Sequence, residues 1–417
     1  MENEKKYILI RRQKIVSFDT ENCYLNFSIC PNDDKVKTPP IEKALKLKKE
    51  LYSDLFKKHY KHIVVLTSAG TSLDNGDEAT RGKTREGLWA FCEAEINAFE
   101  KTIHDLNQKE FYKSKNIEEL LSYIILFKKV NMQVEDDDFN QMIKSLEQKI
   151  AEACKLTLDS KAPHKAFLNK ITARKPSDSR VQLFTTNYDT LFEQAANKAG
   201  FVVIDGFSFT QPREFSGRYF DFDIVNRETT RLKQEDSFIK KVFHLLKLHG
   251  SLNWEKSDNR IIQKDKPEKP LIIYPASEKY ESSYEQPYFE MMSRFQQSMR
   301  NDNVLLIVIG FGFQDKHIQN VIIEAVEQNP SFQLVIVNYN NTGTIDMQLL
   351  APFFDNNEDL ETLEMLYDEN ESKEIFSKTI KQNVTILFDT FGQFTDNYPD
   401  NQTYSENREY ENESVQS

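Results

Sequence analysis

Several features that would assign the chain of 417 residues to a class at once are missing. Its longest apolar runs, such as 304–309, fall well short of the roughly 20 residues that span a bilayer, and the Met-Glu-Asn-Glu-Lys-Lys start has no apolar signal core. Its cysteines are Cys23, Cys30, Cys92 and Cys154, and they form no Cys-x-x-Cys pair. This spacing argues against a zinc ribbon and a disulfide scaffold. We therefore expect a cytoplasmic protein with no membrane partner.

An excess of positive charge is missing too, since 54 basic side chains face 66 acidic ones and the net charge is −12. From Asp355 to Ser417 the chain carries 16 acidic and 4 basic side chains, so residues 1–354 are balanced at 50 of each sign. A balanced body predicts no direct binding of nucleic acid. Residues 396–417 are acidic and nearly free of aliphatic side chains, which predicts a disordered tail. The tail is either solubilising or an arm that docks a basic partner.

What the chain does contain is a series of short β-branched runs, typical of strands buried on both faces of a parallel sheet. Helical stretches separate some of them, for example 189–199, followed by Gly200, and 315–328. Strand, polar loop, helix and strand in alternation predict a Rossmann-like, doubly wound, mostly parallel α/β sheet. Ligands of such sheets bind at the carboxyl ends of the strands. The predicted strands are 63–66, 181–184, 242–248, 304–309 and 334–337.

The segment between the first two predicted strands is too long for a single crossover connection. Residues 86–172 carry apolar helical faces, and we predict a helical insertion there. Ahead of the main domain, 7–10 and 23–29 read as strands and a helix is predicted from Ile41 to Tyr60. The predicted organisation is an N-terminal extension (1–60), a main domain (61–345) with the insertion, a C-terminal segment (346–395) and the tail (396–417).

Two loops after predicted strands are built from small residues. Thr67–Ser72 would let a backbone approach a pyrophosphate and present free N–H groups to it, although a tight turn explains the same residues. Gly310 and Gly312 stand where another strand meets a helix, for which Asp315 is the expected N-cap. Because Asp315 takes the place of the third glycine, the segment is no dinucleotide fingerprint.

Polar residues that could carry chemistry follow three other strands. Asn187 and Asp189 lie two residues apart, so an amide that holds water could stand beside a carboxylate that holds sugar hydroxyls; Asp189 could equally cap the next helix. His249 carries an imidazole that could take a proton from a ribose hydroxyl, or could be a core histidine. Asn338 could bond an adenosine or form a turn.

The other histidines are expected to play no part in this chemistry. We place His244 in the apolar core, since it lies inside the same run as His249. Four more lie among charged residues and are expected to be solvated. They are His59, His62, His104 and His164.

In their order and spacing these motifs resemble those of the SIR2-like family, in particular its prokaryotic NAD-consuming members. Residues 68–72 (Ser-Ala-Gly-Thr-Ser), followed by Gly76 and Arg81, are similar to the family's opening G-A-G-x-S segment, and 87–89 (Gly-Leu-Trp) to the stretch that follows it. The other matches are 185–189 with T-x-N-x-D, 248–254 with L-H-G-S-x-x-W, and 310–315 with G-x-S-x-x-D. The resemblance spans residues 60–340.

Resemblance to that family implies a Rossmann-like NAD+ site with NAD+ as the substrate. Asn187 would position a water molecule at the nicotinamide ribose, and His249 would be the general base. The resemblance implies the following contacts to NAD+: Ala69, Gly70 and Ser72 to the pyrophosphate, Asp189 to the nicotinamide ribose, Gly310, Gly312 and Asn338 on the adenosine side, and Arg81 from the opening segment.

The departures from the family pattern indicate a branch. The paired zinc cysteines of the deacetylases are missing here, so no zinc is expected. Glu78-Ala79-Thr80 replaces the family's Pro-Asp-Phe, whose Phe shields the reaction centre from water, and this change favours hydrolysis. Ser68 and Gly312 replace a family glycine and serine, which alters the expected phosphate and ribose contacts.

The resemblance thus implies an NAD+ hydrolase that gives ADP-ribose and nicotinamide. It further implies an effector of anti-phage defence that assembles as a homo-oligomer and works with a HerA-like ATPase. Two alternatives remain at this point: an NAD-dependent protein deacylase, and a regulatory subunit that senses NAD+ or ADP-ribose without turnover. Retention of both Asn187 and His249 favours chemistry, since a binding protein needs no base.

Overall fold

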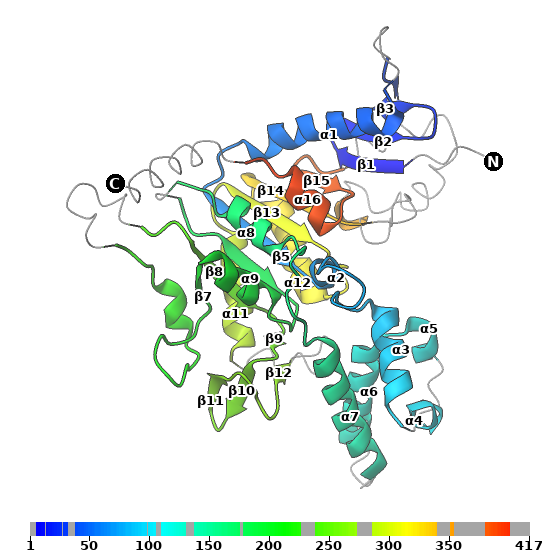
Figure 1. Ribbon diagram of the computed structural model, residues 1–417, viewed down its shortest axis with the longest axis vertical. Helices are drawn as coiled ribbons and strands as arrows, with labels where there is room; N and C mark the ends of the chain where they lie inside the picture. The colour runs from blue at the N-terminus through cyan, green and yellow to red at the C-terminus, as the bar shows by residue number, and fades with distance from the viewer. Residues whose placement is uncertain are drawn as a thin grey trace.

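One large sheet organises the molecule (Figure 1). The computed structural model describes residues 6–12, 14–26, 28–31, 38–97, 99–105, 110–130, 137–175, 178–226, 238–272, 286–339, 351–353 and 380–400. Within these ranges eleven strands pair in the order β4-β3-β2-β1-β15-β14-β13-β5-β6-β8-β7. Helices flank both faces, which confirms the Rossmann-like, mostly parallel α/β prediction.

The parallel part of the sheet runs from β15 to β7, with β5 near its middle. All five strands predicted from apolar runs are present, and β7 and β15 are additional. Their bounds are β5 (His62–Thr67), β6 (Gln182–Thr185), β7 (Val202–Ile204), β8 (Val242–Lys247), β13 (Val304–Ile309), β14 (Phe332–Val337) and β15 (Val384–Leu387).

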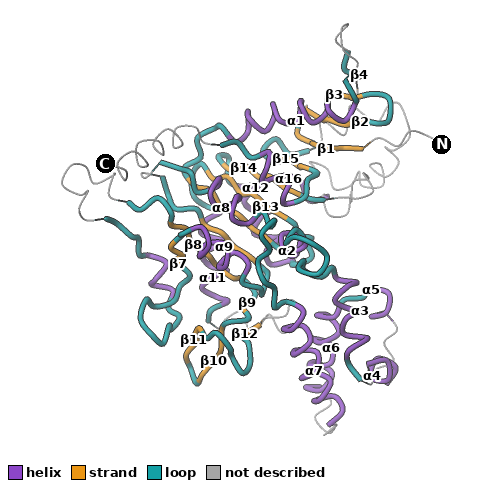
Figure 2. Tube along the Cα trace, viewed as in Figure 1, coloured by secondary structure: helices purple, strands orange, loops and turns teal. Residues whose placement is uncertain are grey.

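The N-terminal strands extend the same sheet in antiparallel fashion. β1 pairs with β15, and β2, β3 and β4 follow outward. The first and last parts of the described chain therefore meet side by side within one sheet, as the tube trace also shows (Figure 2). The bounds are β1 (Lys6–Arg11), β2 (Lys14–Phe18), β3 (Cys23–Leu25) and β4 (Ser28–Ile29).

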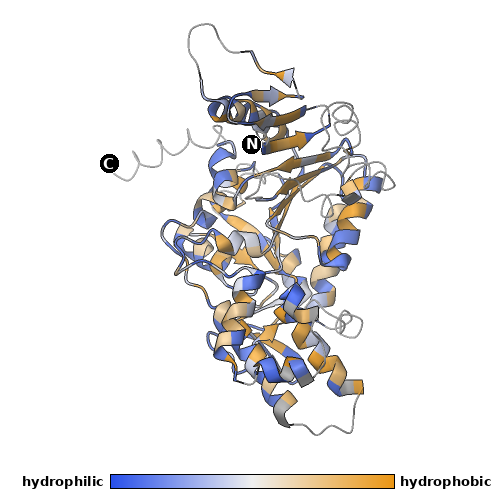
Figure 3. Cartoon of the chain, turned by 90° about the vertical axis from the view of Figure 1, so that its right-hand side faces the viewer, coloured by the Kyte–Doolittle hydropathy of each residue, from blue (hydrophilic) through white to orange (hydrophobic). Residues whose placement is uncertain are grey.

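Alternate residues of each central strand enter two different cores. Val64 and Leu66 of β5 pack on one face with helices α11 and α12, and Ile63 and Val65 on the other with α1, α8, α9 and α16. The strands form an apolar layer between these helices (Figure 3). Burial on both faces explains the absence of apolar–polar alternation in the strand sequences. The helices are α1 (Pro40–Phe56), α8 (His164–Ile171), α9 (Leu191–Ala199), α11 (Tyr288–Met299), α12 (Lys316–Gln328) and α16 (Phe391–Asn397).

Two helix ends follow directly from local sequence. Gly200 closes α9 in the left-handed conformation (φ +72°), which a residue without Cβ adopts at no steric cost. Asp315 caps α12, and its side chain accepts hydrogen bonds from the backbone N–H groups of His317 and Ile318.

Residues between β5 and α8 fold into a helical unit that projects from the sheet (Figure 1). Trp89, Leu121 and Leu146 belong to a core separate from the two cores of the sheet. Tyr188, from the loop after β6, inserts into this third core, so the helical unit packs against that loop. The helices of the unit are α3 (Arg85–Glu95), α4 (Phe99–Asp105), α5 (Glu110–Ser114), α6 (Ile117–Val130) and α7 (Asp137–Ala153).

Short elements complete the described chain. They are α2 (Ala69–Leu73), β9 (Gly250–Ser251), β10 (Trp254–Ser257), β11 (Arg260–Gln263), β12 (Leu271–Ile272), and the 3₁₀ turns Gly217–Asp221 and Ala351–Phe353. Of the tail for which we predict disorder, residues 401–417 lie outside the described ranges, while Tyr398 is buried. None of the helices within the described ranges combines the length and the apolar character needed to cross a membrane.

A buried ion pair joins the two ends of the described chain. Lys48 of α1 and Asp389, just after β15, lie 2.5 Å apart with side chains 2% and 4% exposed. The Tyr52 hydroxyl donates to the same carboxylate at 2.5 Å. The lysine and the hydroxyl together compensate the buried negative charge of Asp389, because an unpaired charge at such a position costs several kcal/mol.

The prediction that His164 is solvated is wrong. Its side chain is fully buried between the rings of Phe192 and Phe391, and neither ring nitrogen has a hydrogen-bond partner. Burial lowers the pKa of His164 to about 3. The nearby charges of Lys161 and Lys165 gave no sign of this burial, because the contacts come from helices distant in sequence.

His164 should therefore make stability depend on pH. Burial lowers the pKa of His164 from 6.5, so between pH 6.5 and pH 3 the imidazole is protonated in the unfolded chain but neutral in the folded one. The free energy of unfolding therefore falls as the pH falls from 6.5 toward 3. The loss attributable to His164 is about 1.4 kcal/mol per pH unit. Urea unfolding at pH 7 and pH 5 should show a shallower pH dependence for His164→Leu than for wild type. Equal slopes for the two proteins would contradict the assignment.

Candidate functional site

Four adjacent parallel strands end level with one another and present their loops at one edge of the sheet. Ile309 of β13 pairs with Thr67 of β5, which pairs with Thr185 of β6, which pairs with Lys247 of β8. The chain leaves β5 toward β6 and β8, then crosses to β13 and β14 on the opposite side. The switch point of this doubly wound sheet therefore lies at β5, where such folds bind their ligands.

Two predicted glycines meet across that switch point. The N–H of Gly70 donates to the carbonyl of Gly310 at 3.2 Å, and a Cβ added to Gly70 would lie 2.5 Å from the Cα of Gly310. Gly310 also has φ +63°, in the left-handed region. Both positions thus need glycine so that the loops after β5 and β13 can touch.

Asn187 holds its side-chain amide in one orientation. Its Nδ2 donates to the Ser68 carbonyl at 3.0 Å, to Thr71 Oγ1 at 3.1 Å and to Ser72 Oγ at 2.9 Å. Because a backbone carbonyl can only accept a hydrogen bond, the NH₂ group must face Ser68. The carbonyl oxygen of Asn187 is thereby turned away from the loop after β5 and remains the acceptor for a further group.

Asp189 joins the same network from the other side. Its Oδ2 accepts from Ser72 Oγ at 2.6 Å and its Oδ1 from the N–H of Leu191 at 3.0 Å, at 7% exposure. Asp189 therefore bonds the first turn of α9 while it also fixes Ser72. The bonds from Asn187 to Ser72 and from Ser72 to Asp189 connect the loops after β5 and β6.

His249 is paired with a carboxylate from another strand. Its Nε2 lies 3.0 Å from Asp315 Oδ2, with side chains 8% and 4% exposed. The other oxygen of Asp315 caps α12, so the carboxylate is anchored before it meets the ring. A histidine oriented by an anchored carboxylate is the arrangement that general bases require. Asp315 was predicted as a helix cap alone; its second role depends on the contact between the loops after β8 and β13.

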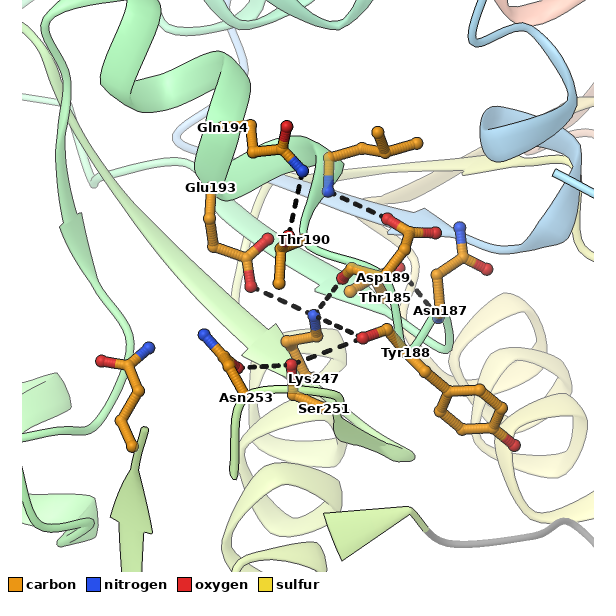
Figure 4. A network of polar contacts seen from close by, with 12 residues as sticks. Thr185, Asn187, Tyr188, Asp189, Thr190, Glu193, Gln194, Lys247, Ser251 and Asn253 are labelled. Atoms are coloured by element: carbon orange, nitrogen blue, oxygen red, sulfur yellow. Dashed lines mark hydrogen bonds and ion pairs between the residues drawn. The ribbon is translucent and has the colours of Figure 1, made fainter. Parts of the chain in front are cut away.

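Lys247, which the sequence patterns did not single out, supports the Asn187 loop from beneath (Figure 4). Its Nζ donates to the carbonyls of Tyr188, at 3.3 Å, and Asp189, and lies 3.1 Å from Glu193 Oε1. The Lys247 side chain is 2% exposed. Burial raises the pKa of Glu193, and the lysine opposes that rise. The sequence signal for this role is weak: Lys247 is a charged residue that directly follows the apolar residues Leu245 and Leu246 of β8.

The remaining predicted residues lie around this centre in different ways. Ala69 begins α2, and Asn338 follows β14 with its N–H bonded to Leu387. Gly312 has open space where a Cβ would stand, so packing does not demand glycine there. The exposed side chain of Arg81 pairs with Glu78 at 3.2 Å, and no contact among the described residues joins it to the buried network.

A cavity of about 860 Å³ lies behind the Asn187 loop, between the end of α7, α9 and the segment 252–270. Glu193 and Gln194 line it, and none of the sequence-predicted site residues does. Where the structure is described, no group of three or more His, Cys, Asp or Glu side chains could hold a metal ion. The expectation that no zinc is bound stays a prediction.

These features define a Rossmann-like α/β protein with a polar centre at its switch point. The model of the SIR2-like domain family matches residues 181–351, which carry Asn187, Asp189, His249, Gly310 and Asn338. Residues 181–351 are therefore similar to a SIR2-like domain, and such domains use NAD+ as substrate. No curated protein matches the chain. The motif before residue 181 lies outside the matched range, but the structure brings it into the same network through Ser72.

Lys247 should be required for the integrity of this loop. In Lys247→Met the carboxylate of Glu193 and two backbone carbonyls lose a buried donor, and we expect a loss of about 3 kcal/mol in urea unfolding. Adding Glu193→Gln should restore part of that loss, because it removes the unpaired charge. Lys241→Met, which deletes a single bond to the Ala199 carbonyl, is the control and should cost about 1 kcal/mol. Equal losses in the two lysine variants would contradict this role.

Proposed function

We propose that the protein is an NAD+ hydrolase that cleaves the nicotinamide–ribose bond to give ADP-ribose and nicotinamide. Two features support catalysis best: the pairing of His249 with Asp315 after β8, and the fixed amide of Asn187 after the neighbouring strand β6. A site that only bound a nucleotide would need neither an oriented base nor an oriented amide. The similarity to a SIR2-like domain supports NAD+ as the substrate.

In the proposed reaction the bond between ribose C1′ and the pyridinium nitrogen breaks, and its electron pair stays with nicotinamide. Water then adds to C1′ of the ribose, where positive charge has developed. The carbonyl oxygen of Asn187 accepts a hydrogen bond from that water and directs its lone pair toward C1′. As the water oxygen bonds to C1′, the water gives a proton to a ribose hydroxyl, which passes its own proton to His249. Asp315 stabilises the resulting imidazolium, which later releases the proton to solvent.

Asp189 contributes by position in this proposal. Its two oxygens are bonded to Ser72 and to the first turn of α9, so it fixes the loop that carries Asn187. A ribose hydroxyl would have to share or displace the Ser72 bond. Ser72 is thus the group whose contact changes when substrate enters.

Removal of either central side chain should abolish hydrolysis. Purified wild type incubated with NAD+ should release nicotinamide and ADP-ribose, followed by chromatography, whereas Asn187→Ala and His249→Ala should lose at least about 100-fold in kcat. Binding of NAD+ by His249→Ala, measured by calorimetry, should persist. His244→Gln is a matched control, because His244 lies in β8, the strand that leads to His249, but outside the site, and it should retain activity.

Full turnover by His249→Ala would show that His249 is not the general base. Absence of product from wild type would instead favour the sensing alternative, provided that NAD+ binds and that the ATPase partner proposed below does not restore turnover. A deacylase would release nicotinamide only when an acyl-lysine peptide is added, so parallel reactions with and without such a peptide separate that alternative.

Asp315→Asn should separate the two roles of this residue. Asparagine is as good an N-cap as aspartate, so α12 should keep its stability, while His249 loses its negatively charged partner. We expect kcat to fall about 100-fold, with little change in KM for NAD+ and in the unfolding midpoint. A fall in stability that matches the loss of activity would indicate a purely structural role.

We also propose a biological setting, which rests on the motif resemblance alone. In it, hydrolysis depletes NAD+ in phage-infected cells, and the protein acts as a homo-oligomer with a HerA-like ATPase. A hydrolase that was always active would exhaust the NAD+ of its own cell, so an inactive state is expected until a trigger arrives. Co-purification with a candidate ATPase, followed by the NAD+ assay on the complex, tests both the partner and the trigger.

A further inference from the structure

Two cysteines that lie seven residues apart face each other in the N-terminal hairpin. The pairing of Tyr24 with Ile29 places Cys23 of β3 opposite Cys30, and the N–H of Cys30 donates to the Cys23 carbonyl at 2.9 Å. Their sulfur atoms are 3.9 Å apart. The hairpin, which the sequence spacing did not suggest as a cysteine pair, therefore brings two free thiols into contact.

The backbone geometry already suits a disulfide. Directly opposed residues that share a hydrogen bond in an antiparallel pair have Cα atoms about 5.5 Å apart, and disulfides need roughly 4.4–6.8 Å. Only rotation of the two side chains is then needed to close the remaining distance between the sulfurs. The hairpin is held in place while this happens, because Lys43 of α1 donates to the carbonyls of Cys30, at 2.8 Å, and Pro31.

Access to the two sulfurs is unequal. Cys23 is 3% exposed and burial raises its pKa to about 12, whereas Cys30 is only half-buried, at the open end of the hairpin. An oxidant from solution therefore meets Cys30 first. Cys23 lies where it can react with the oxidised sulfur of Cys30.

We propose that Cys23 and Cys30 form a thiol-oxidation site that closes to an intramolecular disulfide when a peroxide reaches it. In the first step hydrogen peroxide converts the Cys30 thiol to a sulfenic acid and releases one water. In the second, the Cys23 thiol condenses with that sulfenic acid, the S–S bond forms and a second water leaves. Each sulfur loses one electron, and the peroxide O–O bond accepts both. A thiol reductant reverses the reaction.

The other two cysteines provide an internal comparison. Cys92 is fully buried in the core of the helical unit, and Cys154 packs against that core; burial raises the pKa of both thiols. Among the described residues neither has a sulfur contact of the kind that joins Cys23 to Cys30. We expect both to stay reduced under conditions that oxidise the hairpin.

The test uses the full-length protein and hydrogen peroxide. After treatment, free thiols are blocked with N-ethylmaleimide, and chymotrypsin is used to cut after Tyr24, between the two cysteines. Mass spectrometry of the non-reduced digest should show the Cys23 and Cys30 peptides joined, with both joined peptides free after reduction. Wild type and Cys92→Ser should show the link, and Cys23→Ser and Cys30→Ser should lose it entirely.

Other results would overturn the proposal. These are Cys30 trapped as sulfinic acid while Cys23 reacts with the maleimide, a covalent dimer linked through Cys30, or oxidation of Cys92 and Cys154 ahead of the hairpin pair. The readout is independent of NAD+ turnover, so it stands apart from the proposed hydrolase. Circular dichroism of the serine variants checks that they fold, and a wild type that shows no joined peptides after peroxide treatment would likewise contradict the pairing.

Discussion

The backbone ladder through β13, β5, β6 and β8 is the constraint on which the candidate site depends. Its register makes the four strands end level, so loops from residues 68, 186, 248 and 310 onward emerge at one edge. A one-residue slip in β8 would turn His249 to the opposite face of the sheet, away from Asp315. The packing of Gly70 on Gly310 holds the same alignment from outside the ladder, because any side chain at either position would separate the two loops.

Buried charge is used at two places for different purposes. Lys48 and Asp389 join α1 to the segment after β15 and hold the N-terminal strands to the rest of the sheet. Lys247 and Glu193 lie under the Asn187 loop and hold its backbone instead. In both cases a lysine with almost no exposure is tolerated because its hydrogen-bond donors are occupied, which offsets the cost of removing the charge from water.

The helical unit formed by α3 to α7 contacts the loop after β6 through the side chain of Tyr188. Tyr188 inserts into its core, and the Tyr188 hydroxyl donates to Glu118 of α6 at 2.9 Å. The neighbouring residues Asn187 and Asp189 face the opposite way, toward α2. A shift of the helical unit would therefore be transmitted to Asn187 through one turn of chain, which places the unit where an inactive and an active arrangement could differ.

Local sequence was enough to predict the five central strands from apolar runs, two helix ends and the polar residues at the strand termini. Runs such as 304–309 are apolar throughout because both faces are buried, and Gly200 and Asp315 terminate helices through local backbone chemistry. Tertiary structure alone decided the partners: Asp315 for His249, Lys247 for the Asn187 loop, Cys30 for Cys23, and aromatic rings for His164. The pairing of Cys23 with Cys30 depends on the register of one hairpin, and the other pairings depend on strand order and on helix packing between distant segments. A short sequence motif does not specify which distant segment will pack against it, so these partners could not be predicted from local pattern.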